Sequence, residues 1–88
     1  MNENPKKIEL KDTTEMMISA DYQERFKAEL HQVGIRMEKL IAMVEKYEAG
    51  ELDFIPKCSI GLLKGQIAAM KLYISILYER AEIEQVKI

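Results

Sequence analysis

The chain has 88 residues, of which 48% are hydrophobic and 32% charged; this length predicts a single domain over residues 1–88, and this composition excludes a disordered chain. With 13 basic and 15 acidic residues the formal net charge is −2, so no duplex nucleic acid is expected as a partner. The single Cys58 excludes an internal disulfide and a cysteine-rich zinc site.

Residues 1–11 are polar and are predicted to form an N-terminal arm, with a short extended stretch at 8–10 as an option. The charges at the start of the chain have no apolar core behind them, so they do not form a secretory signal, and a cytoplasmic protein is expected. Asp12 precedes Glu15 by three residues, which is the spacing of a capping box. A short helix is therefore predicted over residues 12–18.

A long helix is predicted over residues 20–49. Asp21 and Glu24 have the capping spacing at its start, and Gly50 is the residue type favoured just past a helix end. Its apolar residues recur at spacings of four and three, the pattern of a coiled-coil seam. They are Phe26, Leu30, Val33, Met37, Leu40, Val44 and Tyr47.

A second long helix is predicted over residues 59–84, after a link that contains Pro56 and with Cys58 or Ser59 as its cap. Its seam has the same spacing and consists of Leu63, Ile67, Met70, Ile74, Leu77 and Ala81. Two long helices joined by a short link lie antiparallel. The predicted fold class is therefore all-α, an antiparallel two-helix hairpin with a short N-terminal helix or arm.

The second helix also carries a row of residues that a hairpin does not need. This row is Leu62, Gln66, Ala69, Tyr73, Ile76, Arg80 and Ile83. Because a hairpin has nothing to cover it, the chain is predicted to assemble into a helical-bundle homo-oligomer, a dimer or higher. The run 59–78 is long enough to span a membrane, but Lys64, Gln66 and Lys71 interrupt it, at about 3 kcal/mol per central lysine. No membrane partner is expected.

The heptad positions determine which residues share a side of the hairpin. If Phe26 and Leu63 are equivalent core positions, one side receives Tyr22, Glu29, Arg36 and Met43 from the first helix and Gln66, Tyr73 and Arg80 from the second. A turn centred at residues 54–55 then predicts three pairs across the seam, namely Glu29 with Arg80, Arg36 with Tyr73 and Met43 with Gln66.

Two interpretations of this side remain open. The charged and aromatic residues form exposed contacts worth less than about 1 kcal/mol each, or they bind a phosphorylated aromatic ligand, because guanidinium groups bind phosphate and tyrosine rings stack on bases. On the second interpretation the expected ligand is a small anionic nucleotide. The predicted ligand-binding residues are Tyr22, Arg25, Arg36, Gln66, Tyr73 and Arg80.

Three glycines lie inside the predicted helices, Gly34 and the Gly-x-x-x-Gly pair Gly61 and Gly65. Each costs about 1 kcal/mol relative to alanine, which close approach of another helix, or of a ligand, would offset. His31 has no partner at metal spacing and Cys58 has no arranged histidine. We therefore predict no metal site, no cofactor and no enzymatic activity.

Two stretches carry a resemblance to known proteins. They are residues 20–29, ADYQERFKAE, and residues 66–73, QIAAMKLY, continuing at 77–84 with LYERAEIE. From residue 12 to its end the chain resembles a family of small phage and prophage proteins named after an open reading frame of a crAss-like phage. The hairpin also resembles, in architecture, the helical hairpin domain of phage sponge proteins that counter CBASS and Thoeris immunity.

The resemblance to the sponge proteins implies a homo-oligomer in the host bacterial cytoplasm. Such a protein binds a nucleotide-derived immune signal, either a cyclic oligonucleotide or an ADP-ribose derivative, and sequesters it without cleavage. The resemblance is one of architecture, so no binding residue is carried over from it. The alternative is a structural or protein–protein interaction module that forms a helical-bundle oligomer and has no small-molecule ligand.

Overall fold

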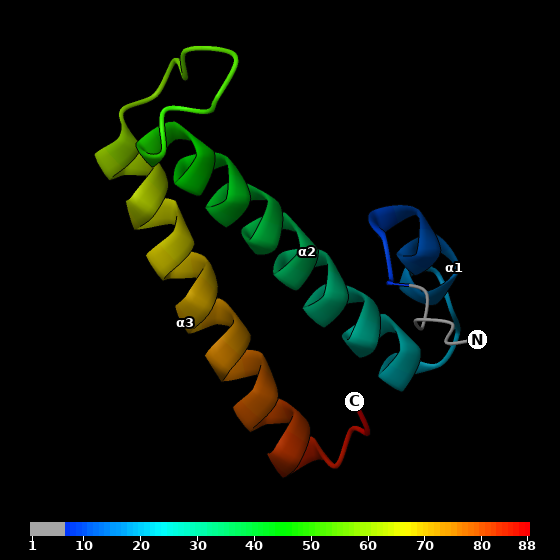
Figure 1. Cartoon of the computed structure of the whole chain (residues 1–88). Helices are drawn as coiled ribbons and strands as arrows, with labels where there is room; N and C mark the ends of the chain where they lie inside the picture. The colour runs from blue at the N-terminus through cyan, green and yellow to red at the C-terminus, as the bar shows by residue number, and fades with distance from the viewer. Residues whose placement is uncertain (1–6) are drawn as a thin grey trace, which may run out of the picture.

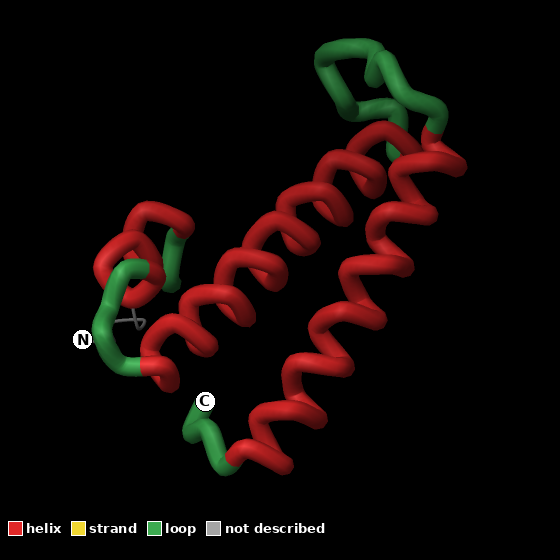
Figure 2. Tube along the Cα trace, turned by 180° about the vertical axis from the view of Figure 1, so that it is seen from behind, coloured by secondary structure: helices red, strands yellow, loops and turns green. Residues whose placement is uncertain are grey.

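The computed structural model describes residues 7–88, and over this range the chain is helical with no strand. Its elements are the 3-10 helix η1 (Leu10–Thr13), α1 (Thr14–Met17), α2 (Tyr22–Glu48) and α3 (Ile60–Glu84). α2 and α3 form the predicted antiparallel hairpin (Figure 1). In Figure 2, as in Figure 1, η1 and α1 lie on the side of α2 away from α3, so α2 is the central helix.

A short N-terminal helical segment is present, but it begins at Leu10, inside the predicted arm 1–11. Of the arm, residues 1–6 lie outside the described residues, and residues 8–10 form no strand. The predicted capping box of Asp12 and Glu15 is wrong. Asp12 instead closes a box one turn earlier, where its Oδ2 accepts a hydrogen bond from the Glu9 backbone N–H at 2.9 Å, so the helical segment begins at Leu10.

A buried threonine fastens this segment to the central helix. The Thr13 side chain donates to the Leu10 carbonyl at 2.7 Å and accepts from the Gln32 amide at 2.9 Å. Thr13 is 1% exposed, so both hydrogen bonds satisfy a group that water does not reach. Through them η1 and α1 are held against α2.

The ends of both long helices are where the sequence places them. Asp21 Oδ1 accepts from the Gln23 N–H at 2.9 Å at the start of α2, and Gly50 follows its end with a φ of +74°, a conformation that favours glycine. Ser59 Oγ accepts from the Leu62 N–H at 3.1 Å and caps α3. These local signals determine the lengths of the two helices and therefore the size of the hairpin.

A cluster of buried residues lies at the end of the hairpin where α2 begins and α3 ends. It consists of Phe26, Leu30, Leu77, Ala81 and Val86, with Ile74 packed against it. Between Gly61 and Gln85, the residues of α3 that are buried or half-buried are those of its predicted seam, and all others are exposed. The seam prediction is therefore confirmed for α3, and α2 covers only one stripe of it.

In the range 7–88, α3 is the one helix that is long and apolar enough to cross a membrane, by length and composition only. The core helix of a soluble protein passes the same test, but such a helix is mostly buried. In α3 only 11% of the most apolar window is buried inside the chain. A single copy of the hairpin therefore leaves most of its most apolar helix uncovered.

Candidate ligand-binding site

The predicted polar side of the hairpin is present. We call its residues the polar row, and they are Tyr22, Glu29 and Arg36 of α2 and Gln66, Tyr73 and Arg80 of α3. The Tyr73 hydroxyl donates a hydrogen bond to the Glu29 carboxylate, and Arg80 Nη2 donates to the Tyr22 hydroxyl oxygen at 3.2 Å. Both contacts join the two helices across the seam, as the assignment of sides requires.

The partners within the polar row differ from the prediction by one heptad. Tyr73 is bonded to Glu29 and not stacked on Arg36, and Glu29 is therefore not the partner of Arg80. The repeat explains the error, because a shift of seven residues brings equivalent positions together on the same side. Arg80 also finds a carboxylate on its own helix, since its Nε lies 3.1 Å from Glu84 Oε2, one turn away.

A compact cluster occupies the open end of the polar row. The Tyr22 hydroxyl donates to Glu84 Oε1 at 2.5 Å, and the Arg80 guanidinium carbon lies 5.2 Å from the centroid of the Phe26 ring. The hydrogen bonds from Tyr22 and then Arg80 lower the pKa of Glu84, while the bond to Glu84 raises the pKa of Tyr22. Arg80 is thus already paired with an anion inside the chain.

Two further predicted residues are also engaged within the chain. The hydrogen bond to Glu29 raises the pKa of Tyr73 above its ordinary value. Arg25 Nη1 donates to the Ser19 carbonyl at 2.7 Å, and its guanidinium carbon lies 5.9 Å from the centroid of the Tyr22 ring. The structure therefore gathers Tyr22, Arg25 and Arg80 at the open end and places Tyr73 one heptad nearer the link.

The other two predicted residues, Arg36 and Gln66, line an open groove of about 380 Å³. Lys39 is the third polar residue of this groove, and the remaining lining is apolar: Leu10, Leu40, Met43 and Met70. Met43 thus lies in one groove with Gln66, its predicted partner. Neither Arg36 nor Lys39 forms an ion pair with another residue in the range 7–88. The groove therefore combines two cations and an amide with an apolar floor.

Sequence reasoning missed Lys39, although a signal for it exists. Residues three apart on a helix lie on the same face, so Arg36 brings Lys39 with it. A second groove of about 400 Å³ adjoins the first, because Lys39 and Met43 line both. It adds Lys46 together with the acidic residues Glu51 and Asp53 and the link residue Phe54, so the surface toward the link has mixed charge.

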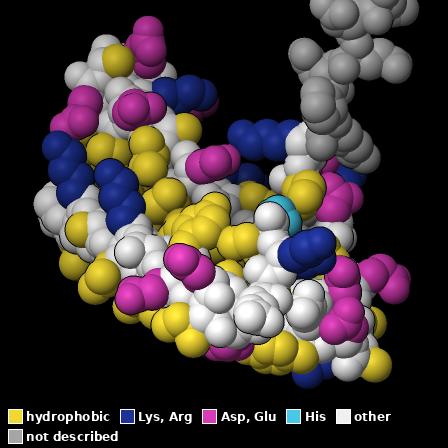
Figure 3. Space-filling model, turned by 90° about the horizontal axis from the view of Figure 1, so that it is seen from below, with side chains coloured by type: hydrophobic (Ala, Val, Ile, Leu, Met, Phe, Trp, Pro, Cys, Tyr) yellow, Lys and Arg dark blue, Asp and Glu magenta, His cyan; other side chains and the backbone are white. Residues whose placement is uncertain are grey.

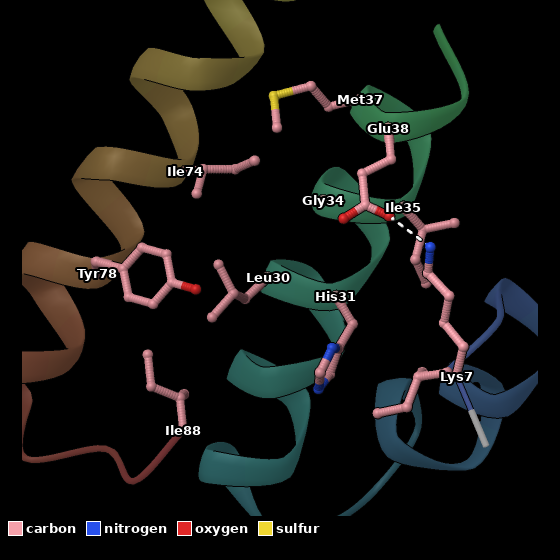
Figure 4. Close-up of a pocket in the computed structure, with 11 residues that line it drawn as sticks. Lys7, Leu30, His31, Gly34, Ile35, Met37, Glu38, Ile74, Tyr78 and Ile88 are labelled. Atoms are coloured by element: carbon pink, nitrogen blue, oxygen red, sulfur yellow. Dashed lines mark ion pairs between the residues drawn. The ribbon is translucent and has the colours of Figure 1, made fainter. Parts of the chain in front are cut away.

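A larger cavity, about 520 Å³, lies elsewhere and was not predicted. Figure 4 shows Tyr78 of α3 and Ile88 of the C-terminal tail facing Leu30, with Gly34 on α2. Figure 3, a view from the end of the hairpin where α2 begins and α3 ends, shows hydrophobic side chains gathered in a hollow with the histidine on its wall. The main charges at this cavity belong to Lys7 and Glu38, which are paired at 3.2 Å. It suits an apolar group better than a phosphate.

Gly34 lines this cavity, and no side chain in the part of the chain that the structure describes explains why it is glycine. A Cβ atom added at Gly34 meets nothing within 4 Å, and the same holds for Gly61 and Gly65. The close helix approach that was predicted for these glycines is therefore not made by residues 7–88 of the same chain.

One comparison with known proteins finds a match. A family model described as Sequestin matches residues 20–83, which contain all of α2, the link and all of α3 except its last residue. No curated protein matches the chain, and no solved structure matches it. The matched segment is the hairpin itself, and all six predicted ligand-binding residues lie within it.

Proposed function

The chain belongs to the Sequestin family, and on that premise we propose that it is a phage protein that sequesters a nucleotide-derived immune signal. The family name denotes sequestration, which is a binding role. The proposed ligand is a cyclic oligonucleotide or an ADP-ribose derivative. It is held without cleavage in the cytoplasm of the host, so that its free concentration falls below the level that the host effector needs.

The observation that carries the proposal is the groove at Arg36, Lys39 and Gln66. Two cations without ion pairs in the range 7–88 face a floor of leucine and methionine side chains. Guanidinium and ammonium groups bind phosphate through charge-assisted hydrogen bonds, and an apolar floor accepts a base or ribose. The groove volume of about 380 Å³ lies in the range of small-molecule sites.

The length of the polar row limits what one chain can do. Gln66 and Arg80 are 14 residues apart on α3, which is about 21 Å along the helix axis. A small nucleotide at Arg36 and Gln66 does not reach Arg80 of the same chain. Gln66 and an Arg80 can contact the same ligand only if the Arg80 belongs to a second copy of the chain, as expected for clefts shared in a homo-oligomer.

The proposal is tested by incubating the purified protein with a panel of cyclic dinucleotides, cyclic trinucleotides and cyclic ADP-ribose isomers. Unbound ligand is removed by filtration, the protein is denatured by heat, and the supernatant is analysed by mass spectrometry. We expect one class of ligand to be recovered intact. Recovery of no intact ligand from any member of the panel refutes the proposal.

A matched pair of lysine variants tests the location of the site. Lys39→Ala removes one charge-assisted hydrogen bond to phosphate, worth about 1.5–3 kcal/mol, and is expected to lower the affinity by about 10-fold or more. The control Lys71→Ala also removes one lysine, but from a part of α3 that does not line the groove, so this variant should bind the ligand as tightly as the parent protein does. Equal affinities of the two variants would place the ligand elsewhere.

The uncovered α3 supports a second candidate function, that of an interaction module without a small-molecule ligand. Its most apolar window is 11% buried, as expected for a helix that binds another protein. On this alternative Lys39→Ala and Arg36→Ala change no small-molecule affinity, while Ile76→Glu abolishes partner binding. The ligand panel and these variants together separate the two functions.

A further inference from the structure

The side of α3 directly opposite its seam is exposed and almost free of charge. We call it the outer face, and it consists of Gly61, Gly65, Ala68, Leu72, Ile76, Glu79 and Ile83, all exposed. Spacings of three and four keep these residues on one side of the helix. The outer face is centred on Leu72, which is 63% exposed and which the sequence-predicted row did not include.

Residue size changes along the outer face. Its first half contains the small residues Gly61, Gly65 and Ala68, and its second half contains the large residues Ile76, Glu79 and Ile83. Among residues 7–88, nothing lies within 4 Å of a Cβ atom built at Gly61 or Gly65. The glycines therefore leave room on the outer face for side chains that this chain does not supply.

The exposed area is larger than that of a monomeric protein of this size. The chain exposes 6859 Å², whereas a monomer of 10.2 kDa exposes about 5,300 Å². With an allowance of about 1,000 Å² for residues 1–6, which lie outside the described range, the excess over a monomer with the mass of the remaining residues is still about 800 Å². A standard interface buries about 800 Å² on each partner.

We propose that the outer face of α3 packs against the outer face of a second copy, antiparallel and about a two-fold axis at Leu72. In this register Leu72 meets its own symmetry mate, and Ala68 meets the partner's Ile76. Gly65 then meets the partner's Glu79, and Gly61 meets the partner's Ile83. Each small residue thus faces a large one, which is the condition for close packing of two helices.

A parallel pairing does not fit the same sequence. It would place glycine against glycine at one end, which leaves a gap, and isoleucine against isoleucine at the other, which crowds. The edges of the antiparallel pair are also favourable in charge, since Lys64 comes beside the partner's Glu82. The gradient of side-chain size along α3 therefore selects the antiparallel arrangement.

The arrangement deepens the proposed function, on which this step rests. In an antiparallel pair, equivalent flanking positions meet on the same edge. Tyr73 then lies beside the partner's Tyr73, and Gln66 lies beside the partner's Arg80. The groove at Arg36 and Gln66 of one chain thus receives the arginine that is out of reach within that chain, and each dimer contains two such composite sites.

The interface is tested first without any ligand. In a Cys58→Ser background, Leu72→Cys places a thiol at the two-fold axis, where helices in contact bring the two Cα atoms within disulfide range. We expect Leu72→Cys to form a covalent dimer under mild oxidation, and the control Leu62→Cys, on the flank of the same helix, to stay uncrosslinked. The reverse pattern, or no crosslink at Leu72→Cys, overturns the proposed interface.

Light scattering in solution gives a second test. The parent protein is expected as an even multiple of the 10.2 kDa chain and Ile76→Glu as a folded monomer, while Ile55→Glu in the link, 89% exposed, keeps the parent mass. The reciprocal swap Ala68→Ile with Ile76→Ala should restore the dimer that Ala68→Ile alone loses. A monomeric parent protein, or flotation of the chain with phosphatidylcholine vesicles, overturns the inference.

Mixing two variants tests the composite site. Gln66→Ala and Arg80→Ala are each expected to lose ligand binding, because every site of either dimer then lacks one contact. In an equimolar mixture half of the dimers are mixed, and each has one intact site, so about a quarter of the sites recover. No recovery overturns the composite site. If the dimer crosslinks through Leu72→Cys but binds no ligand, the proposed interface is supported and only the proposed function is refuted.

Discussion

Gly34 lies in the middle of α2, and its replacement by alanine tests whether the chain itself needs a glycine there. A Cβ atom at this position meets nothing within 4 Å, and the residue has no positive φ. Alanine therefore gains the full difference in helix propensity, about 1 kcal/mol. For a domain of this size a gain of 1 kcal/mol raises the melting temperature by about 4–8 °C.

The assay is thermal unfolding followed by circular dichroism, at one fixed protein concentration because association also changes the melting temperature. Gly50→Ala is the matched control. Gly50 has a φ of +74°, so alanine there is expected to lower stability by about 1 kcal/mol or more. A lower melting temperature for Gly34→Ala would refute the reasoning, since it would mean that something packs over Gly34 in the free protein.

The remaining predictions concern the core and the paired side chains. Leu77→Ala, at a position 0% exposed, should lower the free energy of unfolding by about 3 kcal/mol in a urea titration, and an unchanged urea midpoint would contradict the core assignment. Hydrogen bonds to glutamates raise the pKa values of Tyr22 and Tyr73. These bonds therefore stabilise the folded state fully below a pH of about 10, and the stabilisation is lost as the pH rises above that value. Ultraviolet titration should show two tyrosines that ionise later than the others, and substitution of each by phenylalanine should remove one of them. The pKa of Glu84 is lowered, so its carboxylate stabilises the folded state above a pH of about 4.3, and this contribution is lost as the pH falls. Glu84→Gln should make the stability depend less on pH in this acid range.

The hairpin was predictable because its signals are local. Asp21, Gly50 and Ser59 act within one turn of their own positions, and each is a cap or terminator in the structure. The seam of α3 was predictable for the same reason, since a stripe at spacings of four and three has to face a partner helix. Neither inference needs to know which residues meet across the seam.

The pairs across the seam were not predictable, because a heptad repeat determines the side of a residue and not its partner. Tyr73 and Arg80 lie one heptad apart on the same side of α3, so either could be the partner of Glu29, and in the structure the partner is Tyr73. Arg80 has a further choice within α3, where Glu84 lies four residues along. Competition among partners of similar energy decides such contacts, and exposed pairs differ by less than about 1 kcal/mol.

The position at which the N-terminal segment packs could not be predicted from the sequence either. Ala28 is 1% exposed although it is outside the seam, and it lies one helical turn before Gln32, whose amide donates to Thr13 of the N-terminal segment. The contact depends on Thr13 and Gln32, which are 19 residues apart. No local pattern marks such a long-range hydrogen bond, so the segment was predicted as a helix without a place in the fold.

The pairing of Arg80 with Glu84 bears on how a ligand would be captured. Both side chains are partly exposed, so their ion pair is weak. A phosphate group can accept a bidentate pair of hydrogen bonds from the same guanidinium and carries more negative charge than the carboxylate, so the exchange of one anion for the other favours the ligand. In the free protein Arg80 is held by contacts with Glu84, Tyr22 and Phe26, which lowers the entropy lost on binding. The carboxylate thus holds Arg80 in a position that a stronger anion can take over.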